Sequence, residues 1–149
     1  MDSDSASLPA PPPDILPVWR SPHHLMLDLG GEGRYPAAWN VNISLVKTAG
    51  PGRGEPIPRL IVARHDRLPF ATGSVGIIFM ERTPLTHAAL REIARVIAPG
   101  GLVLLRHSAL PHKDPHAHVG RFFKGRISRT LQGSGSRMFH RTRIVVATN

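Results

Sequence analysis

The chain has 149 residues, a length that suits one globular domain. Its hydrophobic fraction of 41% excludes disorder throughout, and no apolar run approaches the ~20 residues that a membrane helix needs. Cysteine is absent, which excludes disulfides and thiolate metal sites, and we expect a cytoplasmic protein. The formal net charge is +9, and residues 106–149 supply most of it, with nine Arg or Lys against Asp114 alone. Such a basic segment favours an acidic substrate or partner, nucleic acid among them.

The N-terminal segment differs in composition from the rest of the chain. Six of the 15 prolines lie in residues 1–22, among Ser, Ala and Asp. This composition favours extended chain and cannot fill a core, so we predict a disordered Pro-rich tail over residues 1–22. Residues 23–149 are predicted to form a single domain.

Apolar segments predict a sheet that is buried on both faces. Five of them are typical of short strands, at residues 25–29, 39–43, 59–63, 74–80 and 102–105. A last strand is predicted over residues 143–147, antiparallel to its neighbour. The Gly- and Pro-rich residues 48–58 predict a loop.

One helix is predicted over residues 84–98, where apolar residues recur along one face. Thr83 offers a capping hydroxyl and Pro84 suits the first turn. Residues 99–101 (Pro-Gly-Gly) predict the end of the helix and a turn.

A second, basic helix is predicted over residues 115–131. As a helix, this segment would place four basic residues on one stripe: Arg121, Lys124, Arg126 and Arg129. A solvated face is the usual meaning of such a run, and a nucleic-acid contact is the alternative.

This order of elements predicts an α/β fold with a Rossmann-like, mostly parallel sheet and a C-terminal antiparallel strand. Ligands of such folds bind beyond the carboxyl ends of the strands. The polar or glycine residues at or just after the ends of the predicted strands are therefore the candidate site. They are Gly30, Gly31, Gly33, Asn42, Asp66, Glu81 and His107.

Three stretches then match a known pattern in order and spacing. Residues 27–33 (LDLGGEG) are a Gly-rich turn after a strand, residues 66–75 read DRLPFATGSV, and residues 90–103 read LREIARVIAPGGLV. Together they resemble class I S-adenosylmethionine-dependent methyltransferases of the small-molecule, type 11-like branch. The last stretch is similar to that branch's L-x-E-x-x-R-V-L-x-P-G-G signature.

The resemblance implies a cofactor, S-adenosyl-L-methionine, and roles for individual residues. Asp28, Gly30, Gly31 and Gly33 would line its methionine and ribose parts, and Asn42 would face the ribose hydroxyls. Asp66 and Leu68 would flank the adenine. The signature helix is structural in the family. Independently of the resemblance, titratable side chains near the strand ends are the candidates for a catalytic base, namely Glu81, His107 and His87.

The chain also departs from the family pattern. Glu32 and Arg34 stand where glycines are usual, and Asn42 stands where an acid is usual. About six residues separate Gly33 from the second strand, whereas a crossover helix with its loops needs a dozen or so. The first crossover helix is therefore predicted to be short or missing.

His112 and His116 are four residues apart, so a helix would place both on one face, as a metal pair requires. Pro115 interrupts such a helix and Asp114 is the one carboxylate nearby, so we predict no metal.

Three functions remain open. The chain is a compact methyltransferase acting on a small molecule or peptide, a catalytically inactive methyltransferase-like binding subunit, or a basic nucleic-acid-binding module. Because so little chain is left to cover the site, we predict a homodimer or a hetero-complex. Since no apolar run is long enough for a membrane helix, we expect no contact with membranes.

Overall fold

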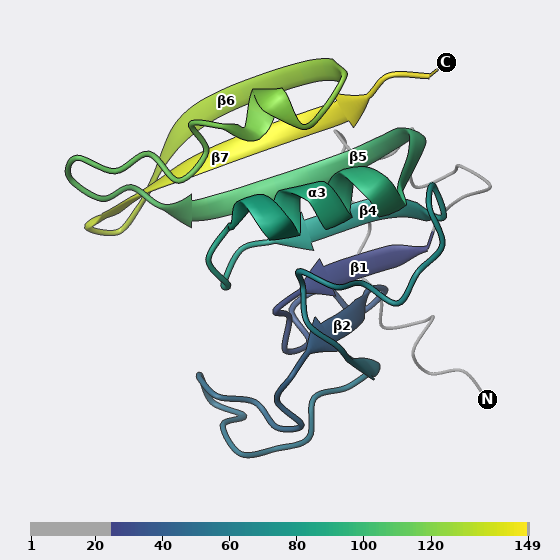
Figure 1. Cartoon of the computed structure of the whole chain (residues 1–149). Coiled ribbons are helices and arrows are strands. Elements are labelled where there is room, and N and C mark those ends of the chain that lie inside the picture. The colour runs from purple at the N-terminus through teal and green to yellow at the C-terminus, as the bar shows by residue number, and fades with distance from the viewer. Residues whose placement is uncertain (1–24, 149) are drawn as a thin grey trace.

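The computed structural model describes residues 25–148, which form one seven-stranded sheet. The strands lie in the order β3-β2-β1-β4-β5-β7-β6; β7 runs antiparallel to β5 and to β6, and the other pairs are parallel (Figure 1). In chain order the elements are β1 (Met26–Leu29), β2 (Trp39–Asn42), β3 (Leu60–Val62), β4 (Val75–Met80), α3 (His87–Val96), β5 (Ile97–Ser108), the 3-10 helix η2 (Val119–Arg121), β6 (Gly125–Ser134) and β7 (Arg137–Val146). The predicted fold class is confirmed.

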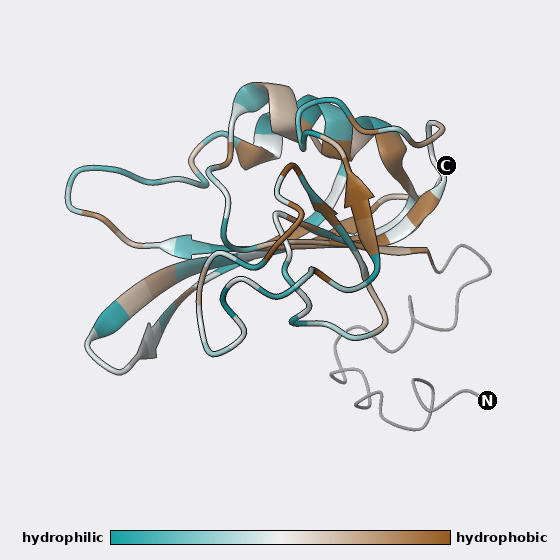
Figure 2. Ribbon diagram, turned by 90° about the horizontal axis from the view of Figure 1, so that it is seen from below, coloured by the Kyte–Doolittle hydropathy of each residue, from teal (hydrophilic) through white to brown (hydrophobic). Residues whose placement is uncertain are grey.

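The two faces of the sheet are covered differently. Helix α3 lies on one side (Figure 2), where its buried residues pack on Leu27, Leu29 and Ile78 of the central strands. On the other side, a second apolar cluster contains Ile77 and Phe79 of β4. The segment between β1 and β2 covers this cluster, with the Tyr35 ring stacked on Phe79 at 3.9 Å between ring centroids.

The predicted loss of the first crossover helix is confirmed. Residues 30–38 join the parallel strands β1 and β2 through turns and bends, without a helix. The connection is shorter than a helical crossover needs. The stacked Tyr35 ring therefore supplies apolar cover that a helix would otherwise give.

Helix α3 begins later than the sequence indicated. Its N-cap is Thr86, whose Oγ1 accepts from the Ala89 N–H at 3.1 Å, so Thr83 and Pro84 precede the helix. Leu85 before the cap and Leu90 inside the helix belong to the same apolar cluster. This pairing stabilises the entry of the chain into the helix at Thr86.

The Pro-Gly-Gly segment does not form a separate turn. The Ile97 N–H still bonds to the Ile93 carbonyl, and the chain passes directly into β5. The register with β4 then jumps from Val75–Ile97 to Ile77–Leu102. Residues 99–101 are thus an irregularity inside a long strand.

The prediction of a basic helix over residues 115–131 is wrong. The structure has the short η2 and then β6, which pairs with β7 along its whole length. Neighbouring side chains of a strand point to opposite faces, so Arg126 and Arg129 lie on opposite sides of the sheet. Ile127 and Leu131 fit a helix by their spacing of four, and they fit one face of a strand equally well.

The predicted tail over residues 1–22 lies outside the described residues. No helix in the described part of the chain is both long and apolar enough to cross a membrane.

Candidate functional site

Three adjoining pockets lie along the carboxyl ends of the parallel strands, and all three include Thr83. The first encloses about 280 Å³ between Gly30, Val41, Asn42, Ile43, Ala63, Arg64, His65 and Thr83. The second encloses about 360 Å³ between Gly30, Glu32, Asn42, Thr48, Ala49, Arg82, Thr83 and Pro84. The third encloses about 290 Å³ between Glu81, Arg82, Thr83, Pro84, Leu85, His107, Ser108, Leu110, Lys113 and Pro115.

The glycine-rich loop lies between the first two pockets. Gly30 and Gly33 have positive φ angles of 75° and 109°, a conformation that favours glycine. A Cβ on Gly31 would come within 2.5 Å of the Asp28 carboxyl carbon. The three glycine N–H groups bond to the Val41 carbonyl, the Asp28 carbonyl and the Asn40 side chain. The loop is therefore shaped by internal contacts.

Asp28 lies beneath this loop and is 3% exposed. Burial raises the pKa of its carboxyl to about 7, against the opposing effect of the Arg34 charge. Asp28 is in none of the three pockets and lies against the glycine loop, of which Gly30 lines the first two.

Two asparagines of β2 fix the loops around the first pocket. Asn40 is buried; its Oδ1 accepts from the Gly33 N–H at 3.1 Å and its Nδ2 donates to the Pro58 carbonyl at 2.8 Å. Asn42 lines the first two pockets and donates to the Gly31 carbonyl at 3.2 Å. Sequence reasoning gave Asn40 no role, because its partners are distant in the chain.

Glu32 lines the second pocket and connects the segments that contain Thr48 and Arg82. Its carboxylate accepts from the Thr48 N–H at 3.0 Å and lies 3.7 Å from the Arg82 guanidinium. Burial alone would raise the pKa of Glu32, but the hydrogen bonds from Thr48 and the Arg82 charge lower it. An ionised carboxylate and a guanidinium therefore stand side by side.

Glu81 borders the third pocket. Its Oε2 accepts from the Arg34 guanidinium and from the Tyr35 hydroxyl, the latter at 2.7 Å. The side chain thus fixes the β1–β2 connection to the end of β4. Burial and the hydrogen bond to Glu81 raise the pKa of Tyr35, so the phenol stays protonated as the donor.

His107 is held at both ring nitrogens. Its Nε2 lies 2.9 Å from the Thr83 carbonyl, and its Nδ1 lies 2.8 Å from His116 Nε2. His116 Nδ1 in turn lies 2.8 Å from the Thr142 hydroxyl. A carbonyl only accepts, so His107 Nε2 carries a proton and donates it to Thr83. His116 Nε2 then donates to His107 Nδ1, and the Thr142 hydroxyl donates to His116 Nδ1.

Burial keeps both imidazoles of this hydrogen-bonded chain neutral. Burial lowers the pKa of His107 and lowers that of His116 to about 3. His107 lines the third pocket, but its lone pair faces His116. The geometry favours a positioning role for His107, which holds Thr83 where the pockets meet.

The other predicted residues lie outside the three pockets. Asp66 bonds to Arg64 through both carboxylate oxygens, and Leu68 is buried in the core. His87 is exposed at the start of α3 and contacts the His118 and Phe122 rings. Asp66 is joined to the first pocket through Arg64, which lines it.

The histidine pair that suggested a metal is not paired. His112 is exposed with a φ of 61°, and His116 is buried in the hydrogen-bonded chain. Within residues 25–148, no group of three or more His, Asp or Glu side chains could hold a metal ion.

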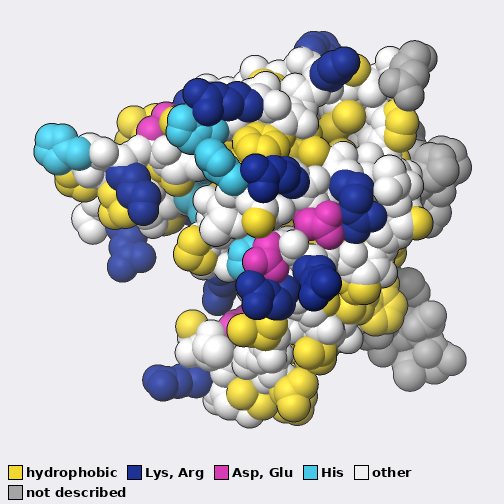
Figure 3. Space-filling view, in the orientation of Figure 1, with side chains coloured by type: hydrophobic (Ala, Val, Ile, Leu, Met, Phe, Trp, Pro, Cys, Tyr) yellow, Lys and Arg dark blue, Asp and Glu magenta, His cyan; other side chains and the backbone are white. Residues whose placement is uncertain are grey.

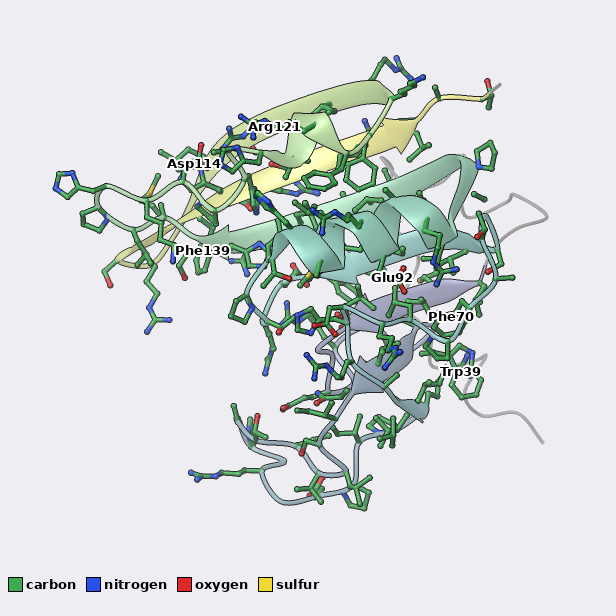
Figure 4. All side chains as sticks on the ribbon, in the orientation of Figure 1. Trp39, Phe70, Glu92, Asp114, Arg121 and Phe139 are labelled. Carbon is green, nitrogen blue, oxygen red and sulfur yellow. The ribbon has the colours of Figure 1, made fainter. Side chains whose placement is uncertain are left out.

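The signature helix fixes the segment between β3 and β4. Glu92 accepts from the Leu68 N–H at 2.8 Å, and Arg95 donates to the carbonyls of Leu68 and Phe70 at 3.0 and 2.9 Å. Figure 4 shows Glu92 and Phe70 close together on this side of the sheet. Arg95 Nε also donates to Glu92 at 2.7 Å. The helix therefore positions the loop that contains Leu68 and Phe70, after β3.

Comparison with known proteins supplies the family. Residues 37–105 match the model of a methyltransferase domain family. Over this stretch the chain is similar to a methyltransferase domain. The cofactor of this family is S-adenosylmethionine, as the sequence predicted. A search of curated proteins found no match.

Solved structures share the fold over most of the chain. A variant of the 16S rRNA (adenine(1408)-N(1))-methyltransferase from Catenulisporales acidiphilia with SAM has a TM-score of 0.57 at 14% identity, covering 93% of this chain and 92% of that one. A SAM-dependent methyltransferase from Methanosarcina mazei has a TM-score of 0.60 at 10% identity, covering 95% and 100%. The geranyl diphosphate C-methyltransferase from Streptomyces coelicolor A3(2) has a TM-score of 0.54 at 12% identity, covering 83% and 73%.

Proposed function

We propose that this methyltransferase domain binds S-adenosylmethionine across the first and second pockets and transfers its methyl group to an acceptor in the third. The observation that carries the proposal is the arrangement of the three pockets around Thr83, at the strand ends where ligands of this fold class bind. Their volumes fall near the lower end of the range for small-molecule sites.

The side chains in the first two pockets fit the parts of the cofactor. Glu32 and Arg82 offer opposite charges to the amino and carboxylate groups of its methionine end. Asn42 stands where the ribose hydroxyls would lie, and Ile43 with Ala63 offers apolar contact to the adenine. In this arrangement Glu32, a departure from the glycine motif, becomes a binding residue.

The domain contributes mainly position to the transfer. The acceptor's lone pair forms a bond to the methyl carbon while the carbon–sulfur bond breaks, and that electron pair stays on sulfur. Where the acceptor carries a proton, Glu81 is the candidate base, because it borders the third pocket and accepts its hydrogen bonds from Arg34 and Tyr35 at one oxygen, Oε2. His87 and His107 remain untested predictions in that role.

A binding subunit without catalysis is the second candidate. It is favoured by the internal bonding of all three glycine N–H groups, which then do not donate to a ligand. The assembly as a homodimer or hetero-complex stays a prediction, which light scattering on the purified chain would test.

Calorimetry with S-adenosylhomocysteine tests the proposal. We expect saturable binding, and Glu32→Gln should raise the Kd roughly tenfold, because a charge-assisted hydrogen bond contributes about 1.5–3 kcal/mol. Glu55→Gln is the matched control, an exposed acid on the neighbouring loop that pairs only loosely with Lys47 at 3.9 Å. No binding at millimolar ligand would reject the proposal, and equal effects of both variants would reject the role of Glu32.

A further inference from the structure

The basic charge of the C-terminal third gathers on one face of the antiparallel part of the sheet. Directly paired residues of antiparallel strands point to the same side. Arg141 pairs with Arg106 and with Thr130, and Arg143 pairs with Ser128. The face also contains Arg126 and Arg137, and we name it the arginine face: Arg106, Arg126, Arg137, Arg141 and Arg143.

The arginine face carries no acidic side chain on β5, β6 or β7. The opposite face of these strands carries no acid of its own either, but other segments bring acids to that side of the sheet (Figure 3), as in the ion pairs Arg95–Glu92 and Arg129–Asp114. Like charges directly across a strand pair, as at Arg106 and Arg141, destabilise a sheet. A bound polyanion would remove that cost.

The remaining side chains on this face indicate which polyanion fits. Ser128, Thr130 and Gln132 of β6 are exposed hydroxyl and amide donors. The Arg106 guanidinium lies 3.9 Å from the centre of the Phe139 ring, which Figure 4 shows on β7. Arginine planes and aromatic rings are the groups on which unpaired bases stack. The exposed apolar residues of these strands, Ile127, Leu131 and Met138, lie on the other face, which argues against a lipid surface.

We propose that the arginine face binds single-stranded nucleic acid. Arg106 lies near the end of β5, two residues before Ser108 of the third pocket. A nucleic acid bound on the arginine face would therefore lead toward the acceptor pocket. Arg141 and Arg143 already have interactions in the structure, so they add charge rather than unused donors. The idea that the bound nucleic acid is the methyl acceptor rests on the proposed function. The idea that the arginine face binds nucleic acid does not.

Fluorescence polarisation with a labelled 20-nucleotide single-stranded RNA tests the assignment on the full chain. Contacts from three or more arginines predict a fall in affinity of roughly 20-fold between 50 and 200 mM KCl. The double substitution Arg126→Gln with Arg137→Gln, at two exposed positions, should weaken RNA binding. It should also reduce the slope of log affinity against log salt concentration by about 1.4. The matched control, Arg53→Gln with Arg91→Gln, removes equal charge from exposed positions elsewhere and should keep the full slope.

Three outcomes would overturn the assignment. They are a flat salt response, equal losses in the two double variants, and displacement of the RNA by a polyglutamate peptide at equal charge concentration, which would indicate an acidic protein partner. Calorimetry with S-adenosylhomocysteine separates this test from the proposed function. If the double variant still binds the cofactor product but not RNA, the arginine face is supported independently; if RNA binds and the cofactor product does not, the methyl-transfer proposal alone fails.

Discussion

Burial disfavours the charged form of Asp28 more than that of any other carboxyl group in residues 25–148. Its pKa of about 7 in the folded chain stands against 3.8 for an exposed side chain. Between these values the folded state holds the proton and the unfolded state releases it. Folding stability is therefore lost as the pH rises from about 4 to 7, and the loss persists above pH 7.

Asp28→Asn removes the ionisable group at nearly constant shape. We expect the variant to be more stable than the natural chain at pH 8 by up to about 4 kcal/mol, with a smaller gain at pH 5. Urea unfolding at the two pH values measures the difference. Asp66→Asn, which alters an ion pair at the surface, is the control and should give no such gain. A gain from Asp28→Asn that is equal at both pH values would contradict the raised pKa of Asp28.

At the scale of elements, the N-terminus of α3 depends on one hydroxyl. Thr86→Ala removes the acceptor for the Ala89 N–H and should cost about 1 kcal/mol, or roughly 2–4 °C in Tm. Thr86→Ser keeps an acceptor and should remain within about 0.5 kcal/mol of the natural chain. Thermal unfolding followed by circular dichroism compares them. Equal losses in both variants would show that methyl packing, rather than the cap, holds this end.

The strands and the helix that the sequence predicted share an apolar pattern. Most have a continuous apolar run or an apolar stripe, as for β4 and α3, and β2 alternates apolar residues with asparagines. Strand β6 lacks this signal because its side chains are exposed on both faces, and its pairing with β7 decides its conformation. Its polar sequence could not distinguish a strand from a basic helix.

The candidate site divides in the same way. The glycine turn and Asn42 were predictable because the turn follows β1 directly and Asn42 ends β2. The contacts of Glu32 with Thr48, and of Glu81 with Tyr35, join residues 16 and 46 positions apart. Nothing local in the sequence encodes such pairs. The positioning role of His107 also depends on partners from other elements, the Thr83 carbonyl and His116.

At the scale of the whole molecule, loops replace helices around the site. Residues 30–38 and the Gly- and Pro-rich stretch between β2 and β3 form walls of the first two pockets, without an α-helix in either segment. Their hydrogen bonds to each other are few and partly exposed, as at Glu32 and Thr48. Segments of this kind open locally at low free-energy cost. A ligand that bridges them should therefore protect them more than it protects the central strands.

Binding of S-adenosylhomocysteine is expected to stabilise the chain unevenly. At a ligand concentration of 100 times Kd, the folded state gains about 2.7 kcal/mol, which corresponds to roughly 5–10 °C in Tm. Amide hydrogen exchange should slow most at residues 30–35, 42–49 and 63–65, and at residues 82–84 where the pockets meet. The hairpin of β6 and β7 lines none of the three pockets and serves as the internal control. Uniform slowing over the chain, the hairpin included, would mean that the ligand stabilises the fold without occupying the first two pockets.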